Sequence, residues 1–109
     1  MSYLLQHGWS IEAHRFRLGH HDLDLVARKG STVAFVEVKT RRSFRFGPPE
    51  QSITRRKRGV LSRVARLWQV RFGLPDDSYR FDLIGVSEAD SSTNPQITHI
   101  EDAWRDVEK

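Results

Sequence analysis

A β-hairpin predicted in the first half of the chain constrains the fold more than any other sequence feature. Residues 22–29 and 32–40 both alternate aliphatic or β-branched residues with polar ones, and only Gly30-Ser31 separates them. A two-residue turn of type II′ requires glycine at its first position, which Gly30 provides. A two-residue turn also predicts which residues of the two strands lie opposite each other.

The predicted register brings charged side chains together at one end of the hairpin. It places Asp24 opposite Glu37 and Asp22 opposite Lys39. Carboxylates that face each other repel, so a fold with this arrangement normally supplies a cation, here Lys39 or a metal ion. The other face of the hairpin is expected to be apolar, pairing Leu23 with Val38, Leu25 with Val36 and Ala27 with Ala34.

A surface ladder in which Lys39 forms a salt bridge with Glu37 or Asp22 is the simpler interpretation, and it would contribute about 0–1 kcal/mol. The segment 33–39, however, is largely apolar on both faces. Such strands are covered on both sides. We therefore expect this strand to lie inside the sheet, with its charged end at a cleft.

Length and composition predict one domain over residues 1–109. A hydrophobic content of 38% supports a folded chain. The absence of cysteine excludes disulfides and thiolate metal sites, and it suits the reducing cytoplasm. No apolar segment approaches the length of a membrane span, and residues 1–9 do not resemble a signal peptide. A cytoplasmic protein without membrane contact is expected.

Basic residues are concentrated in the middle of the chain. Between Arg41 and Arg71 there are ten Arg or Lys residues and one acid, whereas nine acids and three basic residues follow from Asp76 onward. This asymmetry indicates a surface that binds a polyanion. A solvated helix face with no partner is the alternative.

A long amphipathic helix is expected from Thr54, a suitable N-cap, to about Phe72, where Gly73 and Pro75 are stop signals. Lys57 falls on its inner arc in the first turn, from where it could reach the charged end of the sheet. The apolar arc comprises Val60, Leu61, Val64, Ala65, Leu67, Trp68 and Phe72, and the opposite face carries Arg55, Arg56, Arg63 and Arg66.

The remaining segments complete a mixed sheet. A helix end over residues 2–7 is closed by Gly8, and a first strand follows over 9–17. A strand, a long helix and a further strand imply a right-handed crossover between parallel strands. The other expected elements are loops at 44–50 and 88–95, strands at 79–87 and 96–101, and a helical turn or two at 102–109.

These segments together resemble the YraN-like (UPF0102) family of uncharacterised bacterial proteins, which belongs to the PD-(D/E)XK nuclease-like superfamily and is akin to archaeal Holliday junction resolvases. The resemblance covers nearly all of the chain and implies an α/β fold, a restriction-endonuclease-like mixed β-sheet with an αβββαβ core. The matching segments are His7-Gly-Trp, Asp22-Leu-Asp-Leu-Val-Ala-Arg, Phe35-Val-Glu-Val-Lys-Thr-Arg-Arg, Phe46-Gly, the basic helix start at 54–58 and Arg80-Phe-Asp.

The resemblance implies a metal-dependent endonuclease that hydrolyses DNA phosphodiester bonds. The superfamily motif maps onto Asp24, Glu37 and Lys39 as catalytic residues. Asp24 and Glu37 would bind Mg²⁺ (or Mn²⁺), and Lys39 would orient water or stabilise charge. Asp22, where family members usually have Glu, and Lys57 are auxiliary candidates. Family members also carry a Gly-Glu near the start of the first helix, and we expect that part of the helix to be missing from residues 1–109.

DNA is the expected partner, bound through phosphate contacts that give affinity without sequence readout. A binding module without turnover is the rival hypothesis, and a domain that binds an acidic protein is a third. The sequence does not distinguish junction, flap and single-stranded substrates, and a homodimer stays open because junction resolution would need two active sites. The expected DNA-binding residues are Arg41, Arg42, Arg55, Arg56, Arg63 and Arg66.

Overall fold

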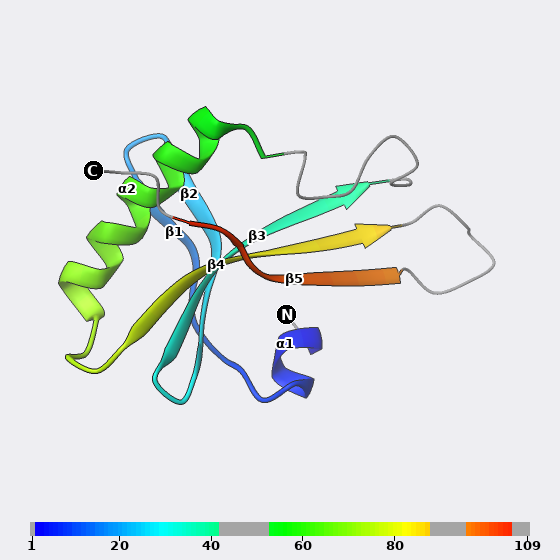
Figure 1. Ribbon diagram of the computed structural model, residues 1–109, viewed down its shortest axis with the longest axis horizontal. Helices are drawn as coiled ribbons and strands as arrows, with labels where there is room; N and C mark the ends of the chain where they lie inside the picture. The colour runs from blue at the N-terminus through cyan, green and yellow to red at the C-terminus, as the bar shows by residue number, and fades with distance from the viewer. Residues whose placement is uncertain (1, 42–52, 88–95, 106–109) are drawn as a thin grey trace.

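The protein consists of a five-stranded mixed β-sheet and two helices (Figure 1). The computed structural model describes residues 2–41, 53–87 and 96–105. The strands follow the chain order across the sheet, from β1 to β5. The elements are α1 (Ser2–Gln6), β1 (Ser10–Leu18), β2 (His21–Lys29), β3 (Thr32–Arg41), α2 (Arg55–Phe72), β4 (Ser78–Ser87) and β5 (Gln96–Trp104).

The sheet is mixed because one connection differs from the others. Neighbouring strands are antiparallel except β3 and β4, which are parallel and joined through α2. The predicted α/β class and mixed sheet are therefore confirmed. The loops predicted at 44–50 and 88–95 lie outside the described residues, as does Arg42.

The predicted hairpin register is confirmed from the turn outward. Lys29 pairs with Thr32, and the ladder continues as far as Leu25 and Val36. Gly30 has a φ of +62°, whereas Ser31 is not among the residues with positive φ. A type II′ turn has positive φ at its first central residue only, so this is the turn type that the sequence predicted.

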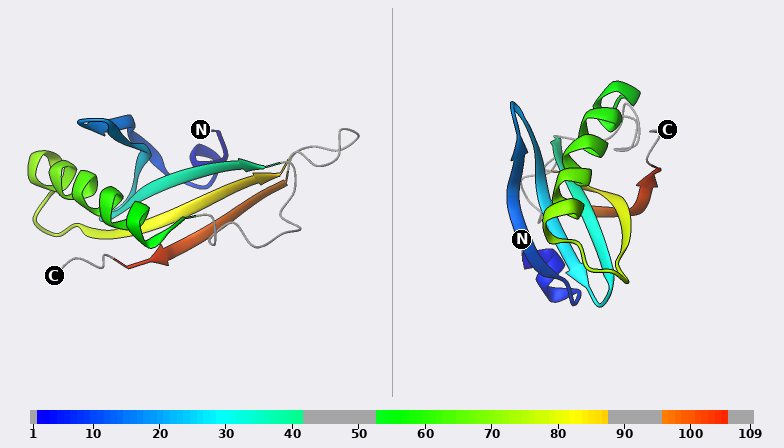
Figure 2. Two further views of the ribbon diagram at one scale, coloured as in Figure 1. Left: turned by 90° about the horizontal axis from the view of Figure 1, so that it is seen from above. Right: turned by 90° about the vertical axis from the view of Figure 1, so that its left-hand side faces the viewer.

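The strand β3 is buried on both faces, as its composition predicted. Val33 and Phe35 pack in one cluster with α2, and Ala34 and Val36 pack in a second cluster with Leu4 of α1. The two helices thus cover opposite faces of a twisted sheet (Figure 2).

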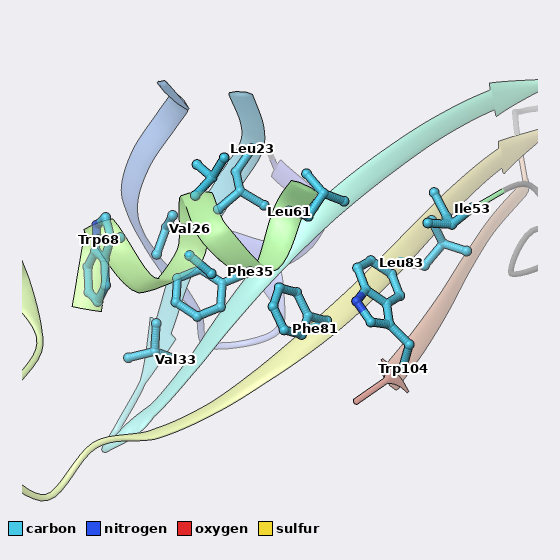
Figure 3. Close-up of a cluster of buried hydrophobic side chains, with 12 residues drawn as sticks. Leu23, Val26, Val33, Phe35, Ile53, Leu61, Trp68, Phe81, Leu83 and Trp104 are labelled. Carbon is cyan, nitrogen blue, oxygen red and sulfur yellow. The ribbon is translucent and has the colours of Figure 1, made fainter. Parts of the chain in front are cut away.

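Aromatic rings link the helix α2 to the far edge of the sheet. Phe35 makes an edge contact with Trp68 of α2 and lies 5.5 Å between ring centroids from Phe81, which stacks on Trp104 of β5 at 5.1 Å. Figure 3 shows this row of rings within the cluster. Such pairs each contribute about 0.5–1.5 kcal/mol beyond the area they bury.

Local signals at both ends of α2 act as the sequence predicted. The hydroxyl of Thr54 accepts a hydrogen bond from the backbone N–H of Lys57 at 3.1 Å, and Gly73 closes the helix by donating to the carbonyl of Gln69. The apolar arc is buried at Leu61, Val64, Ala65 and Trp68. Phe72 was wrongly placed in this core, because it is 54% exposed, although its ring contacts Phe16 of β1. No helix in the described ranges is long and apolar enough to cross a membrane.

The helical turns predicted from residue 102 are wrong as far as Trp104, which ends the strand β5. Asp102 takes a φ of +53° at a register shift opposite Phe81 and Leu83. This irregularity turns the Trp104 ring inward, where its stacking on Phe81 favours extended chain over helix.

Candidate carboxylate site

The strands β2 and β3 part where the ladder ends, and a side chain fills the gap. Asp24 is not a ladder partner of Glu37, although the sequence predicted that pair. Instead, its Oδ2 accepts a hydrogen bond from the backbone N–H of Val38 at 2.7 Å. The side chains of Asp24 and Glu37 are also hydrogen-bonded to each other. The structure thus brings the two acids together, but through their side chains.

Glu37 is a buried acid with a strongly altered proton affinity. Glu37 is 4% exposed, and its Oε1 has no hydrogen-bond partner among the described residues. Burial, followed by the hydrogen bond and the charge of Asp24, raises the pKa of Glu37 to about 8. Near neutral pH Glu37 therefore keeps its proton unless a cation replaces it.

Two lysines supply positive charge to this acid pair. Lys39 lies on the same face of β3 as Glu37, and Lys57 extends from the first turn of α2. Both charges lower the pKa of Glu37, although less than burial and Asp24 raise it. The inner-arc position of Lys57 thus brings its charge to the end of the sheet, as the helical pattern indicated.

Asp22 lies apart from this site, and its expected pairing with Lys39 was wrong. It pairs with Arg17 of β1, and its Oδ2 lies 3.4 Å from the Arg17 guanidinium nitrogen. Leu23 was also misplaced, since it packs in the α2 cluster rather than with Leu25. Both errors have one cause, because alternation in β2 breaks at Asp24.

The neighbouring strand breaks at the same level. In β1, His14 pairs with Leu25 and Phe16 pairs with Leu23, but Arg15 and Asp24 are skipped between them. Arg15 has a φ of +52°, the left-handed region that disfavours a long side chain. Sequence reasoning missed Arg15; the available signal was the unbroken apolar run after Asp24, which departs from strict alternation.

A hollow opens at this double break. Among the described residues it is lined by His14, Arg15, Asp24, Leu25 and Val38, and its volume is about 550 Å³. Asp24 therefore bonds to Glu37 and also lines this open hollow.

The predicted basic face lies along the outer side of α2. Arg55, Arg56, Arg63 and Arg66 are all exposed. Arg55 and Arg56 belong to the same turn as Lys57, so positive charge extends from the acid pair onto the surface. Arg41 ends the strand β3.

A second buried acid anchors α1 to the sheet. Asp82 is fully buried, and its carboxylate lies 3.0 Å from Nε of Arg80 and 2.7 Å from Nε2 of His99. The Tyr3 hydroxyl lies 3.4 Å from Nδ1 of His99. The Arg80-Phe-Asp segment was noted in the sequence, but nothing there pointed to His99.

Side chains that could bind a metal ion do not form a larger cluster in the described ranges. No group of three or more His, Cys, Asp or Glu side chains is placed to hold a metal ion there. Any cation at this site would rest on the pair Asp24 and Glu37, together with water or a substrate oxygen. Mg²⁺ is commonly bound in this way.

Fold and site together define an α/β domain with a pair of acids, of which Glu37 is buried, two nearby lysines and a basic helix. The sequence model described as "Uncharacterised protein family UPF0102" matches residues 1–86, and the chain belongs to this family. It is 38% identical to a UPF0102 protein of Geotalea uraniireducens over 102 residues, 94% of this chain and 80% of that protein. A UPF0102 protein of Geobacter metallireducens is 38% identical over 104 residues, 95% of this chain and 84% of that protein. One of Nocardia farcinica is 42% identical over 84 residues, 77% of this chain and 66% of that protein.

Proposed function

We propose that this protein is a metal-dependent endonuclease of the PD-(D/E)XK type, which hydrolyses DNA phosphodiester bonds on a restriction-endonuclease-like fold. The observation that carries the proposal is the hydrogen-bonded pair of Asp24 and Glu37 beside Lys39. A buried acid with a raised pKa, as at Glu37, is costly for stability. Such perturbed groups cluster at functional sites.

The residues present fit a divalent cation. Glu37 Oε1 is buried without a partner among the described residues, and Asp24 lies beside it, so two hard oxygen ligands converge. When bound by Asp24 and Glu37, Mg²⁺ or Mn²⁺ would polarise a phosphate oxygen and lower the pKa of a bound water.

The chain's own cations would hold the DNA and stabilise the reaction. Lys39 lies on the same face of β3 as Glu37. From there its ammonium would orient the attacking water or stabilise the charge that develops on the phosphate. Lys57 would contact the same phosphate from α2. Exposed Arg55, Arg56, Arg63 and Arg66 would bind phosphates further along the strand, giving affinity without sequence readout.

A DNA-binding module without turnover is the second candidate. The exposed arginine face of α2 favours it, because that face would serve binding whether or not the acid pair holds a metal. The two candidates differ only in whether Glu37 and Lys39 matter for a chemical step.

The test incubates branched, nicked and single-stranded DNA with the protein and Mg²⁺ or Mn²⁺. We expect cleavage by the unsubstituted chain, and its loss in Glu37→Gln and in Lys39→Ala. DNA binding should survive in both variants, because removing transition-state stabilisation need not disturb ground-state contacts. Glu101→Gln is the matched control, since Glu101 is an exposed acid on β5.

Cleavage that persists in Glu37→Gln would contradict the assignment of the site. Binding without cleavage of any substrate would favour the binding module. Resolution of a four-way junction would further require two active sites and hence two copies of the chain.

A further inference from the structure

The hollow beside Asp24 is lined by Arg15, a cation that has no partner among the described residues. Arg15 forms no ion pair or hydrogen bond within the part of the chain that the structure describes. By contrast, Arg17, two residues along the same strand, lies against Asp22. The only acid that lines the hollow, among the described residues, is Asp24, which already bonds to Val38 and Glu37.

The backbone at Arg15 is strained, and its side chain gives no local relief. A left-handed conformation costs a residue other than glycine, asparagine or aspartate about 1–2 kcal/mol. Among the described residues other than glycine, only Asp102 also has a positive φ, and aspartate tolerates this conformation. Strain of this sort is concentrated at functional sites, where the surrounding structure maintains it.

The strain has a geometric consequence. The double break at Arg15 and Asp24 removes one pair from the β1–β2 ladder and opens the hollow between the strands. Leu25 and Val38 form an apolar part of its lining, and His14 adds an imidazole. A cation, an imidazole and an apolar floor suit a nucleotide, whose phosphate is charged and whose base and sugar have apolar faces.

The hollow also lies across the sheet from the basic helix. Leu25 and Val38 belong to the α1 face, whereas Lys57 lies on α2 over the opposite face. Asp24 lines the hollow and bonds to Glu37, so it is common to both sides. A DNA strand passing Asp24 would therefore meet cations before and after it.

We propose that the hollow lined by His14, Arg15, Leu25 and Val38 binds the nucleotide next to the scissile phosphate, and that Arg15 holds that nucleotide's phosphate. This inference rests on the proposed DNA substrate, and it assigns a positioning role to a residue outside the acid pair. Arg15 contacts the DNA backbone and acts before the chemical step.

The test compares two variants that each remove one positive charge from β1. Arg15→Asn removes the guanidinium and places asparagine, which tolerates positive φ, at the strained position. Arg17→Asn removes the arginine that lies against Asp22, outside the residues that line the hollow. Binding of fluorescein-labelled single-stranded and branched DNA is measured by anisotropy across a salt series without divalent cations, and thermal unfolding is measured alongside.

We expect Arg15→Asn to weaken DNA binding by about tenfold or more, as the loss of one charge-assisted contact implies. The slope of log K against log salt should fall by about 0.7–0.9. Arg17→Asn should change affinity less than threefold. The unfolding temperature of Arg15→Asn should equal or exceed that of the unsubstituted chain, an outcome that a purely structural role would not give. Arg15→Gly provides a second variant with the same backbone tolerance.

The outcomes separate this inference from the proposal on which it rests. If the unsubstituted chain binds DNA but Arg15→Asn, Arg15→Gly and Arg17→Asn bind equally well, the subsite is overturned and the endonuclease proposal stands. If the unsubstituted chain binds no DNA, both are overturned. Weaker binding with unchanged stability, confined to the Arg15 variants, supports the subsite.

Discussion

The carboxylate of Asp24 takes the place of a backbone carbonyl in the β2–β3 ladder, accepting the N–H of Val38 at 2.7 Å. Two strands can separate at the end of a ladder only if the freed donors find other partners, because an unpaired buried N–H is costly. Asp24 meets this need while bonding to Glu37 through the same side chain. One residue therefore both maintains the gap in the sheet and forms half of the acid pair.

The first prediction concerns stability and pH without divalent cations. The pKa of Glu37 is raised from 4.5 to about 8, so between these values the folded protein binds a proton that the unfolded chain has released. The free energy of unfolding should therefore fall as the pH rises through this window. Glu37→Gln should remove most of this fall and be the more stable form above pH 8, by on the order of a few kcal/mol. Denaturant unfolding of both proteins near the two pKa values, 4.5 and about 8, measures this difference in the free energy of unfolding.

Two controls accompany that measurement. Glu101→Gln should follow the unsubstituted chain, because Glu101 is exposed and its Oε2 is 3.5 Å from Arg80. Added Mg²⁺ should stabilise the unsubstituted chain more at the alkaline end, since cation and proton compete for the same carboxylates. Identical pH curves for Glu37→Gln and the unsubstituted chain would contradict the raised pKa of Glu37.

The second prediction concerns the basic face of α2. Arg55→Gln and Arg56→Gln should each reduce the slope of log K against log salt for duplex DNA by about 0.9, because each removes one phosphate contact. Arg71→Gln is the matched control, since Arg71 lies in the last turn of the same helix, about 24 Å from Arg55. If all three variants keep the slope of the unsubstituted chain, the arginine face contacts no phosphate and is only solvated.

Local sequence signals explain why much of the fold was predictable. Gly30 specified both the turn type and the register, and Thr54 and Gly73 specified the ends of α2. Each of these signals acts within a few residues along the chain. The apolar composition on both faces of β3 likewise predicted its two layers of packing.

The site was only partly predictable because its decisive feature is not local. The acids at Asp24 and Glu37 were found from the hairpin, but the break in β2 depends on a side chain bonding to another strand. Strict alternation therefore misplaced Asp22 and gave no reason to single out Arg15. Such departures from the local rule are expected where a fold serves a function.

The third prediction concerns the second buried acid. Asp82→Asn should destabilise the protein by about 3–5 kcal/mol, because it removes the fully buried partner of Arg80 and leaves the half-buried guanidinium against a neutral amide. It should also loosen α1, since His99 connects Asp82 to Tyr3. Denaturant unfolding measures the first effect and hydrogen exchange in α1 the second. Loss of the exposed pair in Glu101→Gln should cost less than about 1 kcal/mol. Equal effects of the two substitutions would contradict the buried network.

The last prediction compares two glycines of the same helix region. Gly59 lies inside α2 with open space where a Cβ would stand, so Gly59→Ala should stabilise the protein by about 0.5–1 kcal/mol through higher helix propensity. Gly73 has a φ of −67°, which any residue adopts, but a Cβ there would overlap the Tyr79 hydroxyl and lie 2.6 Å from the Gln69 carbonyl oxygen. Gly73→Ala should therefore destabilise by about 1–3 kcal/mol, the usual cost of overpacking. Combining Gly73→Ala with Tyr79→Phe should recover part of that loss, because the hydroxyl is then absent and only the backbone contact with Gln69 remains. Thermal or denaturant unfolding of the three variants tests the comparison, and a neutral Gly73→Ala would contradict the close packing of β4 against the end of α2.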